Sequence, residues 1–191
     1  MKHQLSRTWK PLPNVVVTND GTVLAAYSPG RSSLSVRRSE DGGETFAASN
    51  NGVAAGVLPD AYPEFGQCVH KIARHPDAPG RLYMQNHGGC PGHPGIGVMR
   101  SDDHGNTWTS IADGLPSDFG FPIVIHPHDP DTVYIVPLEP MTRTCPDAKP
   151  AVWRTENGGK KWRRLSKGLP KRDSFFTVLR DAMTIDDMKS P

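Results

Sequence analysis

Short apolar stretches alternate along the chain with turn signals rich in Gly, Pro, Asp and Asn. The stretches are a few residues long and rich in Val, Ile, Thr and Tyr, which is typical of β-strands. They group into units of four, which we place at 14–49, 67–113 and 121–167, and a further unit begins at 176–188 with a strand at Thr177–Ile185. The pattern predicts an all-β chain.

Repeating four-stranded units of roughly 50 residues are typical of β-propellers. We therefore predict a single, incomplete propeller spanning 1–191, with about three four-stranded antiparallel blades plus one strand of a fourth.

A short box recurs once in each unit, with the pattern S/T-x-D/N-x-G-x-(T)-aromatic. Its Asp or Asn is suited to accept hydrogen bonds from the N–H groups of a turn, and its Gly to supply a positive φ. The hydroxyl should bond back to the turn, and the aromatic residue should anchor the last strand between neighbouring sheets. We interpret the boxes as structural; their residues are Ser39, Asp41, Gly43 and Phe46, then Ser101, Asp103, Gly105 and Trp108, then Thr155, Asn157, Gly159 and Trp162.

These boxes resemble those of the Asp-box, or bacterial neuraminidase repeat, propellers. The stretches 63–71, 85–87 and 114–122 resemble in particular the bacterial exo-alpha-sialidase-like, glycosyl-hydrolase-like subgroup. The resemblance covers about residues 14–187 and implies a carbohydrate-directed propeller. It does not carry over a sialidase site, because the chain has no Arg-Ile-Pro motif and no Tyr that can be tied to a matching Glu.

Known propellers close with 4 to 8 blades, so three blades leave two interpretations. Either the chain is part of a larger propeller, which we favour, or two copies complete each other through their open blade edges. An open arc would expose apolar faces and unpaired strand edges to water.

The candidate site is expected on the face opposite the boxes, where the long loops gather. Chemistry-bearing residues cluster there in the second unit. Glu64 or Asp60 would act as acid or base, with His70 and His87 as further catalytic candidates, and Tyr62, Gln67 and Asn86 would bind substrate. Glycoside hydrolysis usually needs two carboxylates about 5 to 10 Å apart, and a hydrogen-bonded structural role is the plainest explanation for the two histidines.

A metal site is the alternative for the same region. His87, Cys90 and His93, with Cys68 or His70 on the adjacent strand, offer nitrogen and sulfur ligands. Their spacing matches no zinc signature, and 90–95 also fits a plain turn-rich loop, so we expect neither a metal nor a cofactor.

The composition and charge of the chain limit the classes of partner that we expect. The net charge of +2, with both signs interspersed, predicts neither nucleic acid nor a membrane surface as a partner. We find no apolar run long enough to cross a bilayer and no signal peptide, and three widely spaced cysteines do not form a disulfide framework, so we expect a cytoplasmic protein.

Two functions from different classes remain open. One is a glycosidase-like enzyme, with activity impaired in so short a chain. The other is a non-catalytic propeller that recognises a glycan or a protein through its loop face.

Overall fold

The computed structural model describes residues 14–18, 20–30, 33–55, 67–88 and 95–188. Their strands form three four-stranded sheets. The first sheet contains β1 (Asn14–Val17), β2 (Val23–Gly30), β3 (Ser33–Ser39) and β4 (Ala47–Ala48). The second contains β5 (Val69–His75), β6 (Ala78–Asn86), β7 (Val98–Ser101) and β8 (Thr109–Ser110). The third contains β9 (Gly120–His126), β10 (Asp129–Pro137), β11 (Val152–Thr155) and β12 (Arg163–Leu165), and a short 3-10 helix, η1 (Pro146–Ala148), precedes β11.

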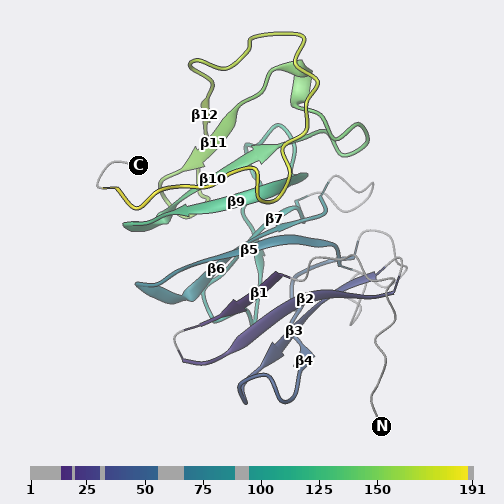
Figure 1. Ribbon diagram of the computed structural model, residues 1–191, viewed down its shortest axis with the longest axis vertical. Helices are drawn as coiled ribbons and strands as arrows, with labels where there is room; N and C mark the ends of the chain where they lie inside the picture. Colours follow the sequence, from purple (N-terminus) through teal and green to yellow (C-terminus); the bar gives the residue numbers. More distant parts are fainter. Residues whose placement is uncertain (1–13, 19, 31–32, 56–66, 89–94, 189–191) are drawn as a thin grey trace.

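Each sheet is an antiparallel meander in which the strands follow one another in chain order. The sheets succeed one another along the long axis of the molecule, from β1–β4 at the bottom of Figure 1 to β9–β12 at the top. The first strands of neighbouring sheets are in contact, β1 with β5 and β5 with β9. This arrangement is that of consecutive propeller blades, in which first strands lie innermost, and it confirms the prediction of a partial β-propeller.

Two apolar cores fill the spaces between the sheets. The first joins Leu24 and Val36 to residues of the second sheet and includes Trp108. The second joins Tyr83 to residues of the third sheet and includes Trp162, whose indole N–H donates to the Ile111 carbonyl at 2.7 Å. The box tryptophan of each later unit therefore packs toward the unit before it.

Phe46, the equivalent residue of the first box, does not act as an anchor. Its side chain is 41% exposed, whereas Trp108 is 3% exposed. The reason lies in the packing direction, because the described chain provides no unit before the first against which Phe46 could pack. The expectation of three equivalent anchors is wrong at this position.

The three box turns share one hydrogen-bond pattern. In the second box, Ser101 Oγ accepts from the Gly105 N–H at 2.8 Å, and Asp103 Oδ1 accepts from the Thr107 N–H at 2.8 Å. The corresponding bonds occur in the first and third boxes. The box glycines have φ between 86° and 100°, the left-handed region that a side chain would strain.

Residues 166–188 form no strand, so the strand expected at Thr177–Ile185 is wrong as secondary structure. A strand needs a neighbour with which to exchange backbone hydrogen bonds, and the described residues provide none here. The segment instead covers the open face of the third sheet, where Val178 and Met183 pack on an apolar cluster that includes Leu138.

Among the described residues, no helix has both the length and the apolar character that a membrane crossing requires.

Candidate functional site

The structure describes only part of the site predicted from the sequence. The acid–base candidates Asp60 and Glu64 and the substrate candidate Tyr62 lie outside the described residues, as do Cys90 and His93. The remaining candidates lie where β5 begins and β6 ends, because these two strands pair in antiparallel register with Val69 opposite Asn86.

Gln67 and Asn86 are interior residues. Each side chain is 1% exposed. Gln67 Nε2 donates to the Val53 carbonyl at 3.4 Å, and Asn86 Nδ2 donates to the Ile96 carbonyl at 3.3 Å. Both amides therefore hold neighbouring backbone, and their burial leaves them little surface with which to contact a substrate.

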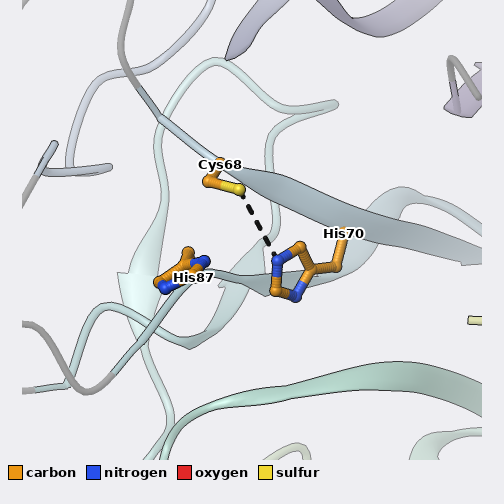
Figure 2. A group of neighbouring side chains, drawn as sticks. All are labelled: Cys68, His70 and His87. Carbon is orange, nitrogen blue, oxygen red and sulfur yellow. Dashed lines mark hydrogen bonds between the residues drawn. The ribbon is translucent and has the colours of Figure 1, made fainter. Parts of the chain in front are cut away.

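Three other side chains come together at the same place. His70 lies in β5, two residues after Cys68, and its Nε2 is 3.6 Å from the Cys68 Sγ. His87 follows β6, and its backbone N–H donates to the Cys68 backbone carbonyl at 2.8 Å. This bond holds His87 opposite Cys68. Figure 2 shows the Cys68 sulfur directed at the His70 ring with His87 beside them. One nitrogen of each imidazole and the Cys68 Sγ all lie within 4.8 Å of one another.

His70 is held firmly in this cluster. Its side chain is 3% exposed, and its Nδ1 lies 2.5 Å from the Gly120 carbonyl oxygen, to which it donates. The rings of Phe119 and Phe121 pack against it, with centroids 5.5 Å and 4.5 Å away. Burial lowers the pKa of His70 to about 4, so the ring is neutral at physiological pH.

His87 is half-buried, whereas His70 is buried. Its ring packs edge-on to His70 and to Phe119, with centroids 5.4 Å and 4.8 Å away. Burial lowers the pKa of His87, and the positive charge of Arg143 lowers it further, whereas Asp118 opposes the shift. The lowered pKa values favour the neutral imidazole form of both residues.

The Asp118 side chain accepts hydrogen bonds from the neighbouring backbone. Its Oδ2 accepts from the Gly95 N–H at 2.9 Å and from the Gly97 N–H at 3.2 Å. Gly97 packs so closely that an added Cβ would lie 1.8 Å from the Asp118 carbonyl oxygen. These contacts give the carboxylate a structural role that joins the loop before β7 to the segment before β9.

Two arginines outside the site predicted from the sequence flank the cluster. Arg180 Nε donates to the His70 carbonyl at 3.0 Å, and its guanidinium lies 5.3 Å from the centroid of Phe121. Arg143 lies in the loop between β10 and β11 and is exposed. The charges of both act on His70. The sequence gives little indication that these arginines lie near the cluster, since both are far from the second unit along the chain.

Comparisons with known proteins place the fold but not the function. No protein-family model matches the chain, and no curated protein matches it in sequence.

Three solved structures of GH74 enzymes resemble it. The enzyme from Niastella koreensis is 15% identical with a TM-score of 0.51, over 85% of this chain and 22% of that one. An ancestral GH74 enzyme is 14% identical with a TM-score of 0.56, over 87% and 19%. The GH74 xyloglucanase from Xanthomonas campestris is 19% identical with a TM-score of 0.52, over 82% and 21%.

The chain thus spans about a fifth of the length of these enzymes. At such low identity the likeness concerns the fold alone. Together with the three meander sheets, it establishes that the chain has a partial β-propeller fold.

Proposed function

We propose that this protein is an Asp-box propeller of the sialidase-like, glycosyl-hydrolase-like kind, and that its loop face binds an acidic glycan without hydrolysing it. The Asp-box assignment is supported by the boxes, which share both their residue pattern and their hydrogen bonds. The GH74 likeness is compatible with a carbohydrate ligand but does not specify one.

The observation that carries the ligand class is the pair of positive charges at the loop face. Arg143 is exposed, and Arg180 is oriented by His70 and Phe121. A guanidinium binds a carboxylate through two parallel hydrogen bonds, so two arginines beside one surface suit a sugar acid better than a neutral sugar.

Binding without turnover is favoured by the state of the described groups. Glycoside hydrolysis needs a pair of carboxyl groups, and the Asp118 carboxylate is already bonded to two backbone N–H groups. Hydrolysis through Glu64 and Asp60 remains the alternative prediction from the sequence.

The test is a calorimetric titration of the full chain with an acidic oligosaccharide and with its neutral counterpart of the same length. We expect the acidic ligand alone to bind, and Arg143→Ala to weaken binding by about tenfold or more, since a charge-assisted hydrogen bond contributes about 1.5–3 kcal/mol. Arg172→Ala is the matched control, because the Arg172 side chain is 88% exposed and pairs only loosely with Asp173.

Three results would contradict the proposal. Equal binding of the neutral oligosaccharide would remove the charge argument, and release of free sugar by the pure protein would show an enzyme. Preference for an acidic peptide over the oligosaccharide would show a protein-binding propeller instead.

A further inference from the structure

The cluster of Cys68, His70 and His87 has ligand chemistry that the proposed glycan binding does not use. Thiolate sulfur and imidazole nitrogen are the ligands that zinc prefers in proteins. His70 lies in β5, whereas Cys68 directly precedes that strand and His87 directly follows β6. The backbone N–H of His87 donates to the Cys68 carbonyl at 2.8 Å, which ties these two flanking residues together and favours a preorganised site.

The distances suit a single metal ion. The Cys68 Sγ and His70 Nε2 atoms lie 3.6 Å apart. At a tetrahedral zinc ion with bonds of about 2.3 Å to sulfur and about 2.0 Å to nitrogen, these two ligand atoms are about 3.5 Å apart. The third donor, on His87, lies within 4.8 Å of both, so coordination of one ion would draw it closer to the other two.

The surroundings of His70 are those of a metal-binding histidine. Such histidines donate their second ring N–H to a carbonyl or carboxylate, which fixes the tautomer and the ring orientation. His70 makes this bond from Nδ1 to the Gly120 carbonyl, which leaves the Nε2 lone pair directed at Cys68 (Figure 2). Phe119 and Phe121 prevent the ring from turning away.

The nearby charges and the ligand types together indicate which metal ion would bind. Arg143 and Arg180 oppose a cation, and Asp118 offsets them in part. The site therefore depends on a thiolate at Cys68, and it should select a thiophilic ion over the oxygen-seeking Mg²⁺ and Ca²⁺.

We propose that Cys68, His70 and His87 form a three-ligand site for zinc or a similar thiophilic divalent cation. The fourth coordination position is left for water or an exogenous donor. This inference does not depend on the proposed glycan binding.

The test is a titration of the reduced full chain with Co²⁺, followed by competition with Zn²⁺. We expect one Co²⁺ per chain, a thiolate-to-cobalt absorption band, the visible bands of tetrahedral cobalt, and displacement by Zn²⁺ but not by Mg²⁺. Cys68→Ser should abolish the thiolate band, and His87→Ala should weaken cobalt binding by at least tenfold. Circular dichroism would check that each variant is folded.

Two matched controls locate the site. Cys145→Ser replaces a cysteine buried in the apolar cluster of the third sheet, and His128→Ala replaces an exposed histidine at the opposite end of β9. Both should leave the cobalt spectrum unchanged. The proposal is overturned if folded wild-type protein binds no cobalt, if Cys68→Ser keeps the thiolate band, or if Cys90→Ser alone removes it.

Discussion

At the level of single residues, the box turns repeat the same hydrogen bonds with side chains that differ in charge. Asp103 and Asn157 occupy equivalent positions and accept the same backbone hydrogen bond, from Thr107 and Lys161. Only the first carries a charge. Burial opposes ionisation of Asp103, but the hydrogen bonds from Thr107 and Ser101 outweigh it, so that the pKa of Asp103 lies below its ordinary value.

A pH-dependent contribution to stability follows at Asp103. A carboxyl whose pKa is lowered by folding stabilises the protein above its unfolded pKa, near 3.8, and loses that contribution as the pH falls through the folded value. We expect Asp103→Ala to lower the free energy of unfolding by about 1 kcal/mol at neutral pH. The loss should shrink as the pH is lowered below about 4.

Asn157→Ala supplies the control, because its loss should be similar in size and unchanged over the same range of pH. Urea unfolding of wild type and both variants at about pH 7 and about pH 3 would measure this. A pH-independent loss at Asp103 would show that charge is not what the carboxylate contributes.

At the level of elements, the core beside each of the first two sheets contains the box tryptophan of the next unit. Trp108 packs in the core between the first two sheets, and Trp162 packs in the core between the second and third. Phe46 has no preceding sheet among the described residues against which to pack, and it is exposed. Three positions that are equivalent in sequence therefore differ in how much they stabilise the fold, because the burial of each side chain depends on whether another unit packs against it.

Substitution by Ala at these positions should expose this difference. We expect Trp108→Ala to destabilise the chain by about 3–5 kcal/mol, as for large aromatic residues in other cores. Phe46→Ala should cost less than about 1 kcal/mol, as for other exposed positions. Chemical denaturation of the two variants would measure both, and equal losses would mean that Phe46 is buried in solution by a partner.

The strands and their grouping were predictable, because each depends on a local alternation of apolar residues bounded by turn residues. The predicted strand at Thr177–Ile185 failed since pairing depends on a neighbour, which local sequence does not reveal. Likewise, Gln67 and Asn86 have the polar character of site residues but face the interior. The approach of His87 to Cys68 depends on the register of β5 and β6, and that of Arg180 to His70 on how the last segment crosses the third sheet.

At the scale of the whole molecule, the arc leaves apolar side chains exposed toward both of its ends. Phe46 lies on the first sheet, and Phe175, Phe176 and Leu179 lie on the segment after the third. Exposed apolar surface of this kind favours association. The alternative interpretation of the sequence, in which open edges of two copies meet, therefore has a physical basis.

Light scattering across a range of protein concentrations would test that interpretation. We expect the mean mass to rise above the 20.9 kDa of a single chain and Phe46→Lys to reduce the rise. A control substitution of the exposed Met141, in the loop between β10 and β11, should leave it unchanged. A constant mass of one chain at all concentrations would contradict association through the open edges.

In the proposed function, the loop face recognises the ligand and the face that carries the boxes does not. Hydrogen–deuterium exchange of the full chain, with and without a saturating acidic oligosaccharide, tests this most directly. We predict slower exchange at His87 and Gly88, around Asp118, and through the loop that holds Arg143, with no change at the box turns. Protection confined to the box turns, or none at the loop face under saturation, would contradict ligand binding at the loop face.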